Sequence, residues 1–202
     1  MATAPTRRTQ EQRRAEMRAR LLDATIDSLM EDGYAATTLR AVAARADVSS
    51  GAMTHHFPRR VDLVGAAVEH LTGQRIAVMR SKLDQLTGDH AQRVRGILDL
   101  LWADFSGPLF NVFVKLWVAA DDDPELYDRL VPLERMLART IAAGITDLAE
   151  DFHRDDLDAR VLAVLSAVRG LALQRAFEPR RTPGHDPWPR VRPILERAVL
   201  NP

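Results

Sequence analysis

The sequence contains no cysteine. Its absence excludes disulfide bonds, thiol nucleophiles and cysteine-ligated metals, and it fits a reducing compartment. The chain also lacks any apolar run that approaches the roughly 18 residues of a membrane-spanning helix. Its first residues, MATAPTRRTQEQRRAEMRAR, have no apolar core of the kind found in signal peptides. We therefore expect a cytoplasmic protein with no membrane partner.

Sequence motifs of common enzyme classes are missing as well. The chain has no GxSxG, P-loop, GxGxxG or HExxH pattern. A helical metal-dependent enzyme stays open as an alternative because of two acidic clusters, the aspartates at 121–123 and His153 with Asp155 and Asp156. Both clusters lie at predicted helix starts, where acidic side chains stabilise the helix dipole, so capping explains them better. We expect no catalytic residue, no cofactor and no metal site.

Net charge is also absent, since 28 basic residues balance 28 acidic ones. The average conceals an asymmetry: residues 1–60 carry 10 arginines and 7 acids, a net charge of +3, and the remainder carries −3. Six of these arginines fall within the first 20 residues. A basic tail is usually only a solvated segment, but beside a DNA-binding unit it adds attraction for phosphates. The segment at residues 37–63 has the pattern of such a DNA-binding unit, so we favour the second interpretation.

Apolar residues recur at helical spacing throughout, and no strand candidate stands out. The pattern predicts an all-α fold of about nine helices. Three short N-terminal helices are followed by helices at about 59–86, 90–106, 108–120, 124–150, 155–178 and 187–200. We expect a flexible basic arm at 1–12, a helix-turn-helix DNA-binding domain at 13–58, and a ligand-binding and dimerisation domain at 59–202.

Residues 37–63, TTLRAVAARADVSSGAMTHHFPRRVDL, have the pattern of a helix-turn-helix. A threonine at 37 or 38 can cap one helix, the turn covers 45–48, Ser49 caps the next helix, and Pro58 ends it. Small residues at the start of the second helix let its backbone approach phosphates and base edges in the major groove. The predicted DNA contacts are Thr37, Thr38, Arg40, Ser49, Ser50, Gly51, Ala52, Thr54, His55, His56, Arg59 and Arg60.

A plain three-helix packing unit would share some of these features, and His55 with His56 would suit a metal. Adjacent side chains on a helix point about 100° apart, however, and no third ligand lies at a suitable spacing. The ordered pattern as a whole resembles the DNA-binding domain of TetR-family transcriptional regulators, from about Leu21 to Val64. The resemblance implies that Arg60 clamps a DNA phosphate at the start of the following helix.

Two positions depart from the family pattern. Asp47 stands where the family mostly has glycine, and aspartate tolerates a left-handed backbone better than most residues. Thr54 stands where the family usually has a tyrosine that contacts phosphate. We expect weaker anchoring at Thr54, offset by His55 or by Arg7 and Arg8 in the N-terminal arm.

The C-terminal two thirds resembles the family's ligand-binding and dimerisation domain in the number and length of its helices. The resemblance implies a homodimer that reads a palindromic double-stranded operator, and a small apolar effector that releases it. Aromatic residues beside the break at Gly107-Pro108 indicate an effector cavity, for which we predict Trp102, Phe105, Phe110, Phe113, Trp117 and Met136. The predicted dimer interface is Leu157, Val161, Val164, Leu165, Val168 and Leu171. A dimeric DNA-binding protein without a ligand stays open as an alternative.

Overall fold

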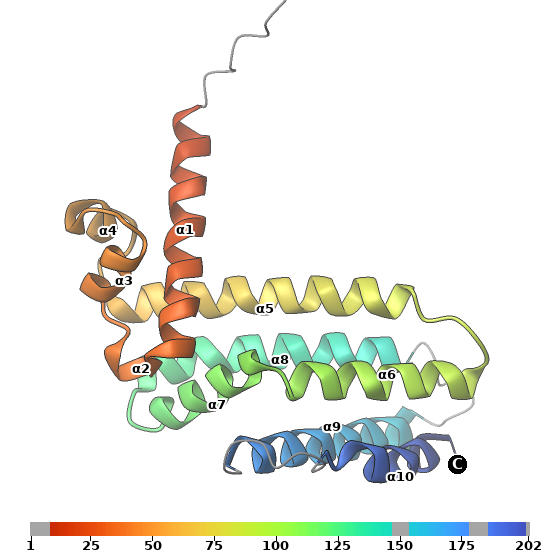
Figure 1. Ribbon diagram of the computed structural model, residues 1–202. Coiled ribbons are helices and arrows are strands. Elements are labelled where there is room, and N and C mark those ends of the chain that lie inside the picture. The colour runs from red at the N-terminus through yellow and green to blue at the C-terminus, as the bar shows by residue number, and fades with distance from the viewer. Residues whose placement is uncertain (1–8, 147–153, 178–185, 201–202) are drawn as a thin grey trace, which may run out of the picture.

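The computed structural model describes residues 9–146, 154–177 and 186–200, and these residues form helices and connecting loops without a strand (Figure 1). The helices are α1 (Gln10–Glu31), α2 (Gly33–Ala36), α3 (Leu39–Arg45), α4 (Ser50–His56), α5 (Arg60–Asp84), α6 (His90–Phe105), α7 (Pro108–Ala120), α8 (Pro124–Thr146), α9 (Arg154–Phe177) and α10 (Trp188–Leu200). The all-α prediction is confirmed. The additional helix is α2, a single turn that is too short to show an apolar period.

The first helix begins earlier than predicted. Thr9 caps α1 by accepting a hydrogen bond from the Gln12 amide (3.1 Å), while the Gln12 side chain accepts one from the Thr9 amide (2.8 Å). Such a reciprocal capping box satisfies two amides at a helix start. The prediction of a flexible arm through residue 12 is therefore wrong for residues 10–12. Arg7 and Arg8 lie outside the described residues.

The predicted turns and caps of the helix-turn-helix are confirmed. Thr38 caps α3 by accepting from the Ala41 amide (3.1 Å), and Ser49 caps α4 by accepting from the Ala52 amide (3.2 Å). Asp47, in the turn between them, has a φ of 52°. The turn is thus left-handed, as its sequence indicates.

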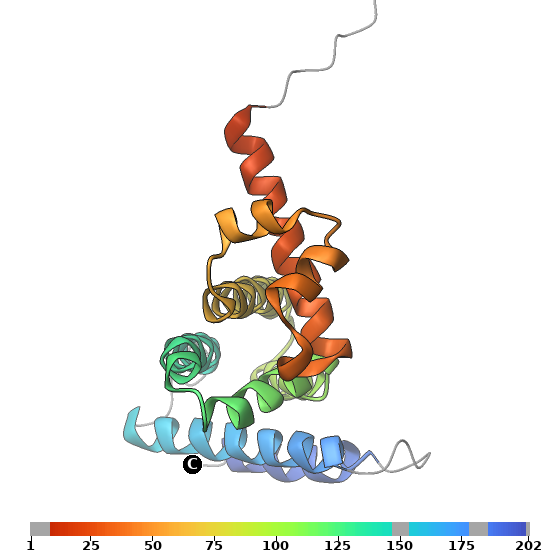
Figure 2. The ribbon, with the colours of Figure 1, turned by 90° about the vertical axis from the view of Figure 1, so that its left-hand side faces the viewer.

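The remaining helices form a layered bundle. Helix α5 packs against α8, and helices α9 and α10 pack against α6. Helices α6 and α8 thus lie between α5 on one side and α9 with α10 on the other, and α1 crosses one end of the bundle (Figures 1 and 2). None of the described helices is by itself long and apolar enough to cross a membrane. Helices α6 and α7 meet that test only as a pair, which is bent by 60°.

Two hydrophobic clusters make up the core. One joins α1, α3, α4 and the first half of α5 to α7 and the start of α8. The other joins the second half of α5 to α6, α8, α9 and α10. Helix α5 contributes to both clusters, and α7 packs with the helices of the helix-turn-helix. The helix-turn-helix therefore has no separate hydrophobic core but shares one with α5, α7 and α8.

Candidate DNA-binding surface and effector cavity

Helix α4 presents an open face of small residues. Ser49, Ser50 and Gly51 are exposed, whereas Met53 is only 1% exposed and packs into the core. A Cβ atom added at Gly51 would meet no atom within 4 Å. Because the small residues of its first turn are exposed, α4 can lie close to another backbone, as a helix must in the major groove. Ala52 is half-buried at the edge of this face.

The threonine pair before α3 divides into a surface residue and a core residue. Thr38 and Arg40 are exposed. Thr37 is fully buried, where its hydroxyl donates to the Gly33 carbonyl (2.8 Å) and lies 3.1 Å from the Ser28 hydroxyl. The prediction of a DNA contact at Thr37 is wrong, because the hydroxyl closes the junction between α1, α2 and α3 instead.

Arg59 and Arg60 both have protein partners. Arg59 donates to Asp62 (2.9 Å) and to Glu125 (2.8 Å). Arg60 stacks 3.9 Å from the centre of the Tyr34 ring and donates to the Tyr34 carbonyl oxygen. Its buried Nε has no hydrogen-bond partner among the residues that the structure describes. Arg59 is thus engaged by carboxylates and Arg60 is held against Tyr34, so a phosphate contact by either residue requires these interactions to change and stays a prediction.

The far end of α4 carries Thr54, His55 and His56. The Thr54 hydroxyl donates to the Ser50 carbonyl within the helix (2.9 Å), so it is already engaged. His55 is exposed and His56 is half-buried. Burial lowers the pKa of His56 below its ordinary value, and the positive charges of Arg14 and Arg18 and the neighbouring His55 lower it further. His56 thus faces α1, a contact that the sequence did not indicate.

The aromatic cluster forms a cavity of about 410 Å³ between α7, α8 and α9. Four of the predicted residues, Phe105, Phe110, Phe113 and Trp117, line it. Trp102 does not, because its ring stacks on Trp188 of α10 (5.1 Å between centroids, planes 5° apart). Met136 does not line this cavity either, because it lies on the exposed side of α8. The prediction is wrong for these two residues.

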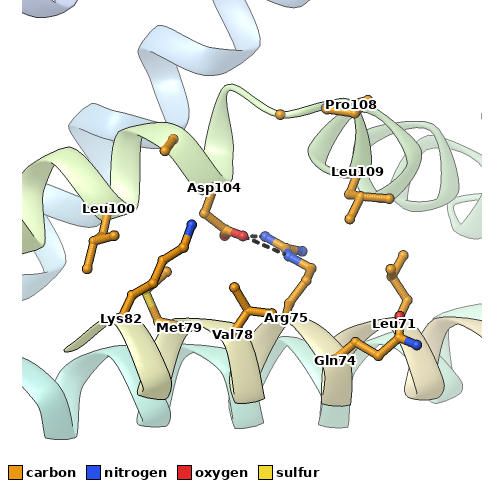
Figure 3. A pocket seen from close by; sticks show the side chains of 12 residues that line it. Leu71, Gln74, Arg75, Val78, Met79, Lys82, Leu100, Asp104, Pro108 and Leu109 are labelled. Carbon is orange, nitrogen blue, oxygen red and sulfur yellow. Dashed lines mark hydrogen bonds and ion pairs between the residues drawn. The ribbon is translucent and has the colours of Figure 1, made fainter. Parts of the chain in front are cut away.

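A buried ion pair separates this cavity from a second one of about 370 Å³. Arg75 of α5 lines both cavities and points toward Asp104 of α6 (Figure 3). Its Nε donates to Oδ1 of Asp104 (3.1 Å), its second donor meets Oδ2, and its side chain is only 5% exposed. Within the described residues the remaining nitrogen, Nη1, has no hydrogen-bond partner. The guanidinium also lies 4.8 Å from the centre of the Phe113 ring.

Sequence reasoning missed Arg75, although a signal was present. Val68, Leu71, Arg75 and Met79 are separated by three, four and four residues, so they share one helix face. A charged residue on an apolar face is a candidate for a paired, buried charge. Arg169 of α9 was missed in the same way; it forms an ion pair with Glu134 at 2.5 Å on the wall of the larger cavity.

The predicted dimer residues on α9 belong to the chain's own core. Val161, Val164, Leu165 and Val168 are at most 7% exposed and pack against α6 and α10, with Leu171 half-buried beside them. Val161, Val164, Leu165 and Val168 are therefore not available to a partner, and the prediction is wrong for these four residues. The side chain of Leu157 lies outside the described residues. The exposed side of α9 carries Ala159, Leu162, Ala163, Ser166, Gly170 and Leu173.

Among the described residues, no group of three histidine, aspartate or glutamate side chains is placed to hold a metal ion. Asp123 instead caps α8 by accepting from the Leu126 amide (3.1 Å), as predicted, and it also accepts from the Tyr34 hydroxyl (2.8 Å). His153 lies outside the described residues.

The sequence of residues 21–67 matches the family model described as bacterial regulatory proteins, tetR family. Over 178 residues the chain is 32% identical to the HTH-type transcriptional regulator CymR of Pseudomonas putida, covering 87% of both chains. The chain belongs to the TetR family. It is a DNA-binding transcriptional regulator, and the resemblance drawn from residues 37–63 is confirmed.

Other relatives match this TetR-family regulator in part. The HTH-type transcriptional repressor KstR of Mycolicibacterium smegmatis is 48% identical over 46 residues, which is 23% of this chain and 22% of KstR. A solved transcriptional regulator from Saccharomonospora viridis, in complex with choline, has the same fold, with a TM-score of 0.68 and 17% identity over 92% of this chain and 94% of that one.

Proposed function

We propose that this TetR-family regulator is a dimeric repressor that leaves its operator when a small, mainly apolar molecule enters the cavity between α7, α8 and α9. The observation that carries the proposal is the position of Phe113. This residue lines the cavity and also belongs to the hydrophobic cluster that holds Val42 of α3 and Met53 of α4. A ligand that displaces Phe113 therefore acts on the packing of the DNA-binding helices.

A polar link supports the same route. The Tyr34 hydroxyl of α2 donates to Asp123, which caps α8, and Arg60 at the start of α5 stacks on the Tyr34 ring. Movement at the start of α8 thus reaches the junction between the helix-turn-helix and α5. A tenfold loss of operator affinity requires the effector to prefer one state over the other by only about 1.4 kcal/mol.

The charges around the cavity define the effector more closely. Its wall is largely aromatic and aliphatic, but two guanidinium groups lie on it, Arg75 paired with Asp104 and Arg169 paired with Glu134. Nη1 of Arg75 has no acceptor within the described residues, so an apolar molecule with one acidic or hydrogen-bond-accepting group complements this site. The relative KstR is a transcriptional repressor, and the S. viridis regulator of the same fold was solved with a bound small molecule. Both support the proposal.

We propose that the dimer forms through the exposed sides of α9 and α10. Leu162 is 66% exposed and Ile194 is 57% exposed, and small residues beside Leu162 let another helix approach closely. A two-fold dimer would present two copies of α4 to a palindromic site. In this proposal residues 13–58 read DNA, residues 59–202 bind effector and partner, and the protein acts in the cytoplasm without enzymatic activity.

The test begins with DNA that flanks the protein's own gene, in a gel shift. Thermal-shift screening then compares medium-chain and aryl carboxylic acids with their amides, and each stabilising compound is added to the DNA complex. We expect the acids to stabilise the protein more than the amides do and to weaken DNA binding. Val114→Trp fills the cavity from α7 and should abolish the response, while Asn111→Trp, on the exposed side of α7, should not.

Each result has a separate meaning. A folded protein that binds none of the flanking DNA would contradict an operator near its own gene. DNA binding that no stabilising compound alters would favour the alternative of a ligand-independent DNA-binding dimer.

A further inference from the structure

The N-terminal half of α1 extends beyond the rest of the helix-turn-helix. Both views show α1 projecting past α3 and α4, on the side away from α9 and α10 (Figures 1 and 2). The capping box at Thr9 and Gln12 marks a defined helix start before this projection. Arg14 and Arg18 are four residues apart, so they lie on the same face of α1, and both are exposed. The basic residues here are held on a helix, in contrast to a flexible tail.

This face of α1 forms a groove with the end of α4. The groove has a volume of about 250 Å³ and is lined by Glu11, Arg14, Ala15, Arg18 and His56. Arg18 lies 4.8 Å from the centre of the Phe57 ring, which is buried in the core. Arg20, two residues further along α1, donates to the Ala46 carbonyl at the end of α3 (2.5 Å). The groove is therefore attached to the DNA-binding unit at several points and needs little ordering before it binds a ligand.

The charges in the groove favour an anion. Arg14, Arg18 and His56 face Glu11, the one acid in the lining, and His55 stands beside His56 on α4. Within the part of the chain that the structure describes, neither Arg14 nor Arg18 has a carboxylate partner. The positive charges of both arginines also disfavour a proton on His56, which lowers its pKa after the larger effect of burial. A bound anion would relieve this repulsion.

We propose that the groove between α1 and the end of α4 binds a phosphate of the DNA backbone, with Arg14, Arg18 and His56 as donors. This site rests on the proposed binding of α4 in the major groove, because the backbone that flanks that groove then passes the end of α4. It also explains how the protein manages with Thr54, whose hydroxyl is engaged within α4. The projecting end of α1 replaces the phosphate contact that a long side chain at position 54 would make.

The salt dependence of DNA binding tests this site directly. Each phosphate contact contributes about 0.9 to the slope of log affinity against log salt concentration. The probes are a labelled random-sequence 30-bp duplex and the fragment that flanks the gene, measured by fluorescence anisotropy at several salt concentrations. For Arg14→Ala/Arg18→Ala we expect the slope to fall by about 0.9 per protomer on both probes, with a roughly tenfold loss of affinity per protomer near 0.1 M salt.

Two further variants serve as controls. Arg80→Ala/Arg93→Ala removes the same charge from exposed positions of α5 and α6, outside the proposed DNA-binding and dimer surfaces, and should leave the slope unchanged. Arg14→Lys/Arg18→Lys keeps the charge and should retain a slope near that of the original protein. The inference is overturned if the alanine variant keeps the original slope, even if its affinity falls, because such a loss would come from a loosened α1. If the original protein binds neither probe, the proposed function itself fails.

Discussion

Asp47 holds the turn between α3 and α4 in a conformation that most side chains avoid. Its φ of 52° lies in the left-handed region, where the Cβ of an L-residue crowds the following carbonyl. The sequence predicted this conformation, because Asp47 stands where the TetR family mostly has glycine and aspartate tolerates a left-handed backbone better than most residues. The consequence is a small local strain at the base of the DNA-reading helix.

Replacing Asp47 separates the effect of strain from that of the side chain. We expect Asp47→Gly to be at least as stable as the original protein, because glycine adopts positive φ without a Cβ clash. Asp47→Ala should be less stable than Asp47→Gly by about 1 kcal/mol. Urea unfolding at neutral pH measures both variants. Equal stability of the alanine and glycine variants would show that the turn relaxes in solution.

The ion pair of Arg75 and Asp104 is the second feature at this scale. The two side chains are 5% and 17% exposed, so removing one partner leaves a charge in an apolar wall. We expect Asp104→Ala to lower the free energy of unfolding by about 3 kcal/mol, and Arg75→Met/Asp104→Leu to recover most of that loss. Arg95→Ala, which breaks a pair at the surface with Glu196, should cost much less, because solvent screens such a pair. Urea unfolding of the four proteins tests the comparison, and a double variant no more stable than Asp104→Ala would contradict it.

Among the elements, α2 and α8 are joined by one hydrogen bond between distant parts of the sequence. Tyr34 and Asp123 are 89 residues apart, so the sequence around either residue does not predict the hydrogen bond between them. The capping role of Asp123 was predictable from the proline and glutamate that follow it. The second role, as acceptor for Tyr34, became visible only when α1 and α7 were placed side by side.

This bond should make acid stability depend on Tyr34. The Tyr34 hydroxyl is the main cause of the low pKa of Asp123, and the Leu126 amide adds to it. Because the pKa of Asp123 is lower in the folded protein than its ordinary value of 3.8, its contribution to stability is complete well above that pH and is lost as pH falls through the folded-state pKa. We expect Tyr34→Phe to lower the free energy of unfolding by about 1 kcal/mol at pH 7. The difference between the two proteins should shrink below about pH 4, where the carboxylate accepts a proton.

Denaturant unfolding from pH 7 to pH 3 measures that difference. Tyr127→Phe, at an exposed position of α8, is the matched control and should show no such pH dependence. A difference between Tyr34→Phe and the original protein that stays constant with pH would mean that Asp123 is not the partner in solution.

For the whole molecule, the proposed dimer depends on which side of α9 faces outward. The valine-rich side fills the chain's own core, and the exposed side carries Leu162 between small residues. The periodicity of α9 could not distinguish the two sides, because apolar and small residues occur all around the helix. Only the positions of α6 and α10 decide it.

A charge placed on the exposed side should therefore separate the protomers. We expect Leu162→Arg and Ile194→Arg to shift the protein from dimer to monomer at micromolar concentration without unfolding it. Val78→Arg, at a position of α5 that is 53% exposed, should remain dimeric. Sedimentation velocity measures the oligomeric state, and circular dichroism verifies that each variant keeps its helical content. A monomeric original protein, or arginine variants that sediment as dimers, would rule out this interface.

The sequence by itself determined the DNA-reading unit. Its caps, its left-handed turn and the small residues of α4 interact across only a few positions, so their order in residues 37–63 was enough to identify both the structure and the family. The tertiary structure decided the rest. The burial of Thr37, the pairing of Arg75 with Asp104, the stacking of Trp102 on Trp188 and the contact of α1 with His56 all depend on residues far apart in the chain. Whether a side chain on a helix faces core, cavity or solvent follows from the elements packed around it, and local spacing does not contain that information.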